Sequence, residues 1–478
     1  MTPRKANESP ENDVSTAAAA GAGLNRRRFL AAGALAAGLA AASPVADAEA
    51  ARRRSKKRCA KPKARPKPKP AARSLPPIGS GGQPTPPARL AELAHQIGHG
   101  DAVTLLDLAA FDANLAIAAN IARAEGWALR PALKSFQSPG FIAYALARLP
   151  EPRGLVFHLR VVDEILAEAP AGTDLMLGYP PSPSELEQFL ATPPPATRHR
   201  MRILVDSLEL LEQVVRLAPA ARRPFEVALQ LESGFELSGL RTPAELDAAL
   251  KQIRAARLNL TAVLCYDGHG AFQPERAFRQ TVKDDAQRRF AAWIVQLRAA
   301  GIDTDRLVRN GPASSTYKLW RGAREPNEIS LGAGLLNHGY ITEDGHDNEG
   351  LQPTLHHAAA VHRVTTPYVP LASTPDPQAR GRDGVSIKGG AWPDHAGSVA
   401  APVHPPGLES DELSGGAGNN QASFYAPKGA LNRGDYVVLR PKHAGDAIDY
   451  FSALVAVRDG TPRRVWPTLR RPGGSVTL

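Results

Sequence analysis

The sequence predicts an α/β protein made of a (β/α)8 barrel and a second, mostly β domain. Between Ala102 and Gly334, short apolar runs alternate with segments of helical periodicity. This stretch of about 235 residues is close to the size of a typical barrel. Past Tyr340 the pattern changes to short β-like pieces interrupted by Gly and Pro. A doubly wound open sheet is the competing architecture, but no Gly-x-Gly-x-x-Gly follows the first predicted strand.

The predicted barrel strands are short and mostly aliphatic. They are 103–106, 129–134, 155–157, 175–177, 203–205, 227–231, 260–265, 307–308 and 329–331. Two of the clearest helical patterns run over 242–256 and 275–300. In the second domain, strands are expected at 435–439 and 452–457, and long loops are expected over 373–422. We therefore divide the chain into 1–48, 49–88, 89–345 (the barrel) and 346–478 (the β-rich domain).

The N-terminus has the layout of a twin-arginine export signal. Asn25 and three arginines precede Phe29 and Leu30, and an uncharged Ala/Gly/Leu stretch runs from Ala31 to Ala42. Ala46-Asp47-Ala48 has the small-x-small pattern of a signal peptidase site. Residues 1–48 are thus expected to be removed on passage through the twin-arginine machinery, which would leave a periplasmic or otherwise exported protein.

A basic, proline-rich linker follows the signal. Twelve Lys or Arg and no acidic residue lie between Arg52 and Arg73, so this segment accounts for the net charge of +11. Such a composition cannot bury a core and predicts an extended, solvated spacer. Because the rest of the chain is nearly neutral, we expect no nucleic-acid partner. Peripheral contact of the linker with anionic envelope surfaces is the alternative to a plain spacer. The two cysteines, Cys59 and Cys265, indicate neither a disulfide framework nor a Cys-based metal site.

One lysine stands out because of its position. Arg130-Pro131-Ala132-Leu133-Lys134 places Lys134 at the C-terminal end of an early barrel strand, where barrel enzymes build their active sites. An inward-facing lysine there would lose its water, which favours a neutral amine able to form a Schiff base with an aldehyde.

The surrounding motifs resemble the D-threonine aldolase and D-serine dehydratase family of pyridoxal phosphate (PLP) enzymes, which share the alanine racemase barrel. The resemblance covers roughly 101–345 and 430–471. It rests on the lysine segment 130–134, on Tyr266-Asp267-Gly268-His269, on the turn 310–317 and on the strand end 331–334. It implies catalytic roles for Lys134, Tyr266 and His269. The cofactor contacts that it implies are Lys134, Arg130, Tyr266, Gly311, Ser314, Ser315, Thr316, Gly332 and Ala333.

The second domain resembles the β domain of the same family. Its metal pattern, Pro-x-His-x-Cys or Pro-x-His-x-Asp, corresponds here to Pro441-Lys442-His443-Ala444-Gly445-Asp446. The second ligand position holds Gly445, so a divalent ion (zinc or manganese) would need His443 together with Asp446, one residue late. A hydrogen-bonded, metal-free His443 is the other reading. We expect His443 and Asp446 to lie near the barrel mouth and close to Lys134, and tight metal binding to be absent.

Three further positions depart from the family pattern. Ala132 replaces a histidine, Leu237 replaces an arginine near the phenolic oxygen of the cofactor, and Asn419-Asn420-Gln421 replaces Glu-His-Gly. The resemblance implies a lyase acting on D-β-hydroxy-amino acids as small-molecule substrates, and it allows a homodimer. The alternatives are an amino-acid racemase and a barrel that binds PLP or an amino acid without turnover.

Overall fold

The computed structural model describes residues 82–273, 275–337, 350–368, 381–390, 401–410 and 421–469. The export signal, nearly all of the basic linker, and Asn419 and Asn420 lie outside these residues. None of the helices in the described part is long and apolar enough to cross a membrane.

Eight parallel strands form a nearly closed barrel, which confirms the predicted fold class. The order around the barrel is β2-β9-β8-β7-β6-β5-β4-β3. A bridge between Ala132 and Leu155, with the Leu155 N–H donating to the Pro131 carbonyl at 2.8 Å, joins the two end strands. The strands are β2 (Ala128–Leu129), β3 (Arg153–Val156), β4 (Thr173–Leu177), β5 (His199–Val205), β6 (Glu226–Gln230), β7 (Leu260–Leu264), β8 (Val308–Asn310) and β9 (Glu328–Ile329).

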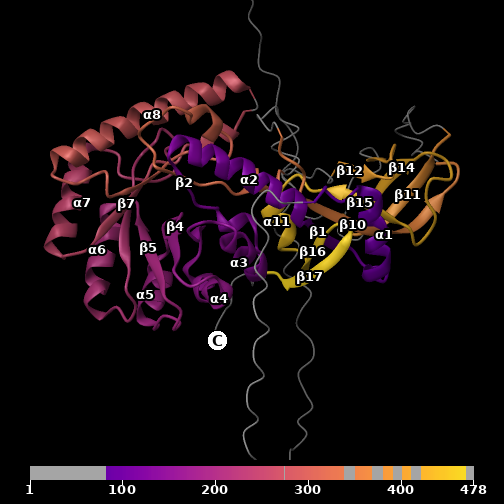
Figure 1. The fold of residues 1–478 in the computed structure, drawn as a ribbon, viewed down its shortest axis with the longest axis horizontal. Helices are drawn as coiled ribbons and strands as arrows, with labels where there is room; N and C mark the ends of the chain where they lie inside the picture. The colour runs from indigo at the N-terminus through magenta and orange to yellow at the C-terminus, as the bar shows by residue number, and fades with distance from the viewer. Residues whose placement is uncertain are drawn as a thin grey trace, which may run out of the picture. The chain divides into compact units, whose positions relative to one another are not determined.

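Helices surround the barrel strands (Figure 1). Several begin at a side-chain cap that satisfies backbone N–H groups of the first turn. Thr242 and Glu245, for example, form a capping box at the start of α7. The helices are α2 (Leu108–Glu125), α3 (Pro139–Ala147), α4 (Val162–Glu168), α5 (Pro183–Ala191), α6 (Leu208–Leu217), α7 (Pro243–Ala255), α8 (Arg276–Ala299) and α9 (Ala333–Leu336). The single-turn 3-10 helices are η1 (Leu133–Ser135), η2 (Leu159–Val161), η3 (Ala218–Ala220), η4 (Gly268–Ala271) and η5 (Tyr317–Trp320).

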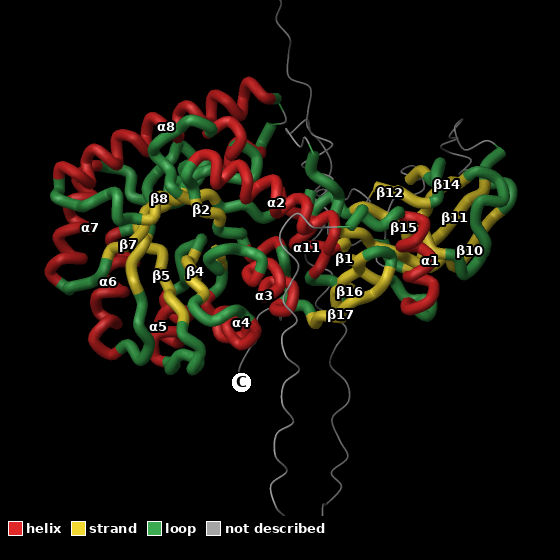
Figure 2. Tube along the Cα trace, in the orientation of Figure 1, coloured by secondary structure: helices red, strands yellow, loops and turns green. Residues whose placement is uncertain are grey.

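The second domain is a mostly β unit, as predicted, seen as yellow strands in Figure 2. Its strands follow the order β13-β14-β11-β10-β1-β16-β17, and β15 pairs with β10 and β12. The elements are α1 (Pro87–Gly98), β1 (Val103–Asp107), β10 (Leu355–Thr365), β11 (Asp383–Lys388), β12 (Ala401–His404), β13 (Glu409–Ser410), β14 (Gln421–Ala426), β15 (Tyr436–Arg440), α11 (Ala444–Ile448), β16 (Ala453–Arg458) and β17 (Thr461–Pro467).

The predicted strand at 103–106 exists but does not belong to the barrel. As β1 it pairs antiparallel with β10 and parallel with β16 in the second sheet. The first barrel strand is β2, which follows α2. The run Val103–Leu106 is aliphatic, and such a run is equally compatible with either sheet, because hydrophobicity does not specify the pairing partner.

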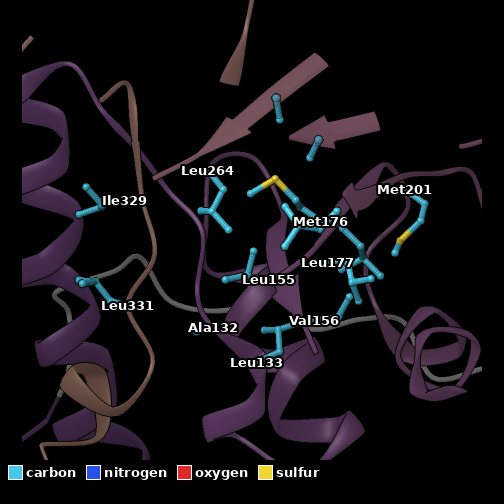
Figure 3. Packing of buried hydrophobic residues seen from close by; sticks show 14 of the residues in the cluster. Ala132, Leu133, Leu155, Val156, Met176, Leu177, Met201, Leu264, Ile329 and Leu331 are labelled. Atoms are coloured by element: carbon cyan, nitrogen blue, oxygen red, sulfur yellow. The ribbon is translucent and has the colours of Figure 1, made fainter. Parts of the chain in front are cut away.

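The main apolar core fills the barrel and the space under its helices. Figure 3 shows Leu133 and Ala132, the residues before Lys134, close to Leu155 and Val156 of the neighbouring strand β3. Ile329 and Leu331 line the same cluster. Residues of the second domain, including Ile448 and Leu454, belong to this core as well. The segment that carries Lys134 is therefore fixed on its apolar side by close packing.

Candidate active site

Lys134 lies in a short turn at the C-terminal end of β2. We call residues 132–135 the lysine turn. Leu133 and Ser135 are buried, whereas Lys134 is exposed and its Nζ lies 4.7 Å from the ring centroid of Phe157. The expectation of a desolvated, inward-facing lysine is therefore wrong for this structure. The 3-10 turn directs Leu133 into the core and leaves Lys134 at the mouth of the barrel.

A second turn, which we call the phosphate turn (residues 311–316), follows β8. The Ser314 hydroxyl accepts hydrogen bonds from the N–H groups of Gly332 at 3.2 Å and Gly334 at 3.4 Å. This pair of bonds ties the phosphate turn to the segment after β9 that contains Ala333. Ser315 Oγ is buried and has no hydrogen-bond partner among the described residues.

Close backbone approaches bring the lysine turn, the phosphate turn and the His269 segment together. A Cβ on Gly332 would lie 2.6 Å from Ser135 Oγ, and a Cβ on Gly270 would lie 3.4 Å from Ser315 Oγ. A Cβ on Gly270 would also lie 2.6 Å from Thr316 Cγ2, so a side chain at Gly270 or Gly332 would force its neighbours to shift, and these glycines limit how near the segments come. The elements singled out in the sequence therefore meet at one end of the barrel.

Asp267 organises this meeting point, and sequence reasoning assigned it no role. It is fully buried; its Oδ1 accepts from the Ala313 N–H and its Oδ2 from the Trp320 indole N–H, both at 2.8 Å. The Thr316 hydroxyl is a third partner. Burial raises the pKa of Asp267, and these hydrogen bonds oppose that rise. The one sequence feature that could have predicted this role is the position of Asp267, a carboxylate three residues after the apolar strand β7.

Tyr266 and His269 flank Asp267. Burial and the charge of Asp267 raise the pKa of Tyr266 to about 12, so its hydroxyl stays protonated at neutral pH. His269 stacks on Phe235 with ring centroids 5.1 Å apart, and its Nδ1 is buried without a hydrogen-bond partner among the described residues. Burial lowers the pKa of His269, which leaves a neutral imidazole able to accept a proton. Leu237, at the position of the family arginine, is exposed.

Arg130, expected at the cofactor, lies instead inside the barrel. Its Nε donates to Glu328 Oε1 at 2.6 Å, Nη2 donates to Glu328 Oε2 at 3.1 Å, and Nη1 donates to the Asp174 carbonyl at 2.8 Å. The charges of Glu328 and Asp174 outweigh desolvation and keep the pKa of Arg130 above its usual range. A fully buried arginine requires such partners, and here they come from β4 and β9. Arg130 thus links barrel strands through its ion pairs. The prediction that it contacts the cofactor is therefore replaced by a structural role in this structure.

Two other predicted cofactor contacts, Thr316 and Gly311, pack against protein atoms in this structure. The Thr316 side chain is buried and bonded to Asp267, as described above. Gly311 packs against the Phe290 ring, from which a Cβ would be 3.2 Å away. Both residues shape the phosphate turn. The Thr316 hydroxyl is bonded to Asp267, so Ser314 and Ser315 supply the other two hydroxyls of the turn.

The predicted metal residues lie in and before α11. His443 is half-buried and immediately precedes the helix, while the Asp446 side chain lies outside what the structure describes. A Cβ on Gly445 would lie 2.9 Å from the Lys134 carbonyl oxygen. In the described ranges, no group of three or more His, Cys, Asp or Glu is arranged to hold a metal ion. The position that carries a ligand in the family therefore has no room for a ligand side chain.

The phosphate turn does fit the phosphate of PLP. A buried hydroxyl without a partner, the glycines that leave space around it and the adjoining lysine turn are the features that such an anion requires. A cavity of about 200 Å3 adjoins Lys134. Apolar residues such as Ile142, Val156 and Ile165 line much of it, with His158 and Arg160 among its polar residues.

Comparisons with known proteins agree with this architecture. Residues 106–337 match the family described as alanine racemase, N-terminal domain. D-threonine aldolase from Filomicrobium marinum is 18% identical with a TM-score of 0.64, covering 77% of this chain and 95% of its own. D-threo-3-hydroxyaspartate dehydratase from Delftia sp. HT23 is 17% identical with a TM-score of 0.60, covering 77% and 97%.

An alanine racemase from Bacillus anthracis with bound L-Ala-P is 14% identical with a TM-score of 0.56, covering 77% of this chain and 97% of that one. No curated protein matches the chain in sequence. These likenesses extend over both domains and establish the fold as the alanine racemase type with a second β domain. Residues 106–337 of this chain therefore match the alanine racemase N-terminal domain family, and the described part of the chain has the fold of the solved structures named above.

Proposed function

We propose that this protein is a PLP-dependent lyase that acts on D-β-hydroxy-amino acids. The observation that carries the proposal is that the segment 332–334 contacts both the lysine turn and the phosphate turn, and that the Ser315 hydroxyl of the phosphate turn is buried without a partner among the described residues. Lys134 would bind the cofactor covalently, and Ser314, Ser315 and neighbouring backbone N–H groups would hold its phosphate. When bound, PLP supplies an electron sink that stabilises negative charge at the substrate Cα.

The protein's own residues would handle the protons. In an aldol cleavage, the neutral imidazole of His269 would accept the proton of the substrate β-hydroxyl while the Cα–Cβ bond breaks and an aldehyde leaves. Lys134 Nζ would then protonate Cα, which completes glycine. A neutral His269 suits this role, since burial lowers its pKa. The cavity beside Lys134 has apolar walls and includes the cationic side chain of Arg160, which could bind a carboxylate group of the substrate.

Two of the solved structures that resemble this chain favour the lyase reaction over others. An aldolase and a dehydratase of D-β-hydroxy-amino acids align over both domains. Racemisation is the second candidate, because the barrel family is that of alanine racemase and the metal position holds Gly445. A racemase would interconvert the two enantiomers of its substrate, whereas an aldolase would release glycine and a dehydratase would release ammonia.

Covalent trapping tests the cofactor assignment directly. Purified protein incubated with PLP and reduced with borohydride should carry a pyridoxyl group on the peptide that contains Lys134. The label should be lost in Lys134→Ala and kept in Lys251→Ala, which removes an exposed lysine of α7. Incubation with D-threonine, D-serine or alanine enantiomers, followed by analysis for glycine, ammonia and chirality, then assigns the reaction. A labelled peptide elsewhere in the chain would refute the role of Lys134.

A further inference from the structure

Gly445 of α11 touches the backbone of the lysine turn. A Cβ at this position would lie 2.9 Å from the Lys134 carbonyl oxygen and 3.3 Å from the Ser135 Cα. The atoms that it would meet belong to the main chain, which cannot rotate away as a side chain can. Any residue other than glycine must therefore displace either the lysine turn or α11.

The lysine turn has little freedom to yield. Its own N–H groups are bonded, with Ser135 donating to Ala132 O at 3.2 Å and Phe136 donating to Leu133 O at 3.0 Å. On the side of β3, a Cβ on Gly154 would lie 2.6 Å from Leu133 Cδ1. On the side of the segment after β9, Gly332 packs against Ala132 and Ser135. The turn is thus enclosed by close contacts from β3, from the segment after β9 and from α11.

The helix on the other side of the contact is equally fixed. Ala447 and Ile448 are buried, and Ile448 belongs to the main core that also contains Leu133. The Phe451 N–H donates to the Ile448 carbonyl at 3.0 Å, which holds the helix end in place. A side chain at position 445 would therefore strain two well-packed segments, and such overpacking is destabilising.

We infer that Gly445 is a positioning residue for Lys134. Its close contact with the Lys134 carbonyl fixes the backbone of the lysine turn, and thereby the direction in which the lysine side chain leaves the backbone. The position at which related proteins place a metal ligand serves here as a packing contact. The significance of this contact for catalysis rests on the proposed function of Lys134, whereas the contact itself does not.

A size series at this position separates packing from metal binding. Gly445→Ala adds only a methyl group, and Gly445→Asp adds the carboxylate of the family pattern. Gly98→Ala is the control for crowding away from the lysine turn, because a Cβ on Gly98 of α1 would clash with the Tyr436 hydroxyl within the second domain. Each variant is compared by thermal unfolding, PLP titration, the visible spectrum of the bound cofactor and hydrogen exchange of the cofactor-free protein.

Gly445→Ala should weaken PLP binding about tenfold or more and shift the cofactor spectrum. The amides of Ser135 and Phe136 should exchange faster in the cofactor-free protein, while Gly98→Ala changes neither. Gly445→Asp should be at least as impaired as Gly445→Ala and gain no stoichiometric zinc or manganese. If both Gly445 variants fail to fold, Ala447→Gly, which loosens α11 without adding atoms, should raise the same exchange rates.

Three results would overturn the inference: wild-type PLP affinity and exchange in Gly445→Ala, metal binding with raised activity in Gly445→Asp, or unchanged exchange in Ala447→Gly. Failure of the proposed function looks different. In that case the wild-type chain binds no PLP at Lys134, while the exchange comparison still reports whether Gly445 holds the lysine turn.

Discussion

The Asp267 carboxylate accepts a hydrogen bond of 2.8 Å from the indole N–H of Trp320, and both side chains are fully buried. Through its other oxygen Asp267 also holds the Ala313 N–H at 2.8 Å. One carboxylate thus links the segment after β7 to the phosphate turn and to η5, which follows that turn. The shape of the phosphate turn therefore depends on Asp267, a residue that is fully buried.

Asp267→Asn should therefore weaken PLP binding while keeping the side-chain shape. An amide has a single acceptor oxygen, and its NH2 group would face an N–H donor of Ala313 or Trp320. Loss of a hydrogen bond to a charged group costs about 1.5–3 kcal/mol, so we expect affinity to fall roughly 10- to 100-fold. Titration with PLP measures this, with Asp303→Asn, an exposed carboxylate, as control. Equal affinities for the two variants would contradict the role of Asp267.

Ser315→Ala should move two measured quantities in opposite directions. Because Ser315 Oγ is buried without a partner, removing it from the cofactor-free protein should leave the free energy of unfolding unchanged or raise it by up to about 1 kcal/mol. PLP affinity should fall about tenfold, since the hydroxyl would donate to the phosphate. Urea unfolding and cofactor titration report the two effects. Lower stability with unchanged affinity would show that the hydroxyl is structural.

Arg130→Met should destabilise the barrel without a specific effect on the cofactor. Removing the guanidinium leaves Glu328 buried with Arg153 as its one remaining cationic partner among the described residues. Breaking a buried pair in this way costs about 3–5 kcal/mol in unfolding free energy. Equilibrium unfolding at neutral pH measures the loss, and PLP affinity of the folded fraction should equal that of the wild type. A normal stability combined with lost PLP binding would restore Arg130 as a cofactor ligand.

Two buried histidines of β10 should make the fold sensitive to acid. Burial lowers the pKa of His356 to about 4 and that of His357 to about 3, against about 6.5 in the unfolded chain. Because the folded pKa values are depressed, their contribution to stability is present above pH 6.5 and is lost as pH falls toward 4. Each residue should cost about 2 kcal/mol between pH 6.5 and pH 5.

Urea unfolding at pH 7 and pH 5 tests this linkage. His357→Phe should reduce the pH dependence, because it removes one titrating group while keeping a ring to stack on Phe451, whose centroid lies 4.8 Å away. His362→Gln replaces an exposed histidine of the same strand and should leave the pH dependence unchanged. A pH dependence that is the same in all three proteins would point to other groups.

Export remains a proposal from the sequence. We expect that changing Arg26, Arg27 and Arg28 together to lysine leaves the precursor in the cytosol, because the twin-arginine route reads the guanidinium pair. Fractionation of cells that express the wild-type and variant chains, followed by N-terminal sequencing near Ala48, provides the measurement. Delivery of the variant to the periplasm at the wild-type level would argue against this signal.

The sequence by itself determined the barrel, the presence of a second β domain and most barrel strands. The expectation of long loops over 373–422 was wrong, because this range contains β11, β12 and β13 and the start of β14. Amphipathic periodicity and aliphatic runs are local properties, so patterns such as 242–256 were recovered as α7 with ends shifted by about one residue. The motifs around Lys134, His269 and Ser315 were likewise readable, since each is contiguous in the chain.

Only the tertiary structure decided which elements are partners. The strand Val103–Leu106 looked like a barrel strand and pairs in the other sheet, because hydrophobicity encodes burial and not the identity of the neighbour. Arg130 was predicted at the cofactor but lies in the barrel interior, because Glu328, which is distant in sequence, neutralises its charge there. The contacts of Asp267 with Trp320 and of Gly445 with Lys134 join residues far apart in the chain. No local sequence pattern predicts such contacts, because they exist only once the folded chain has brought these residues together.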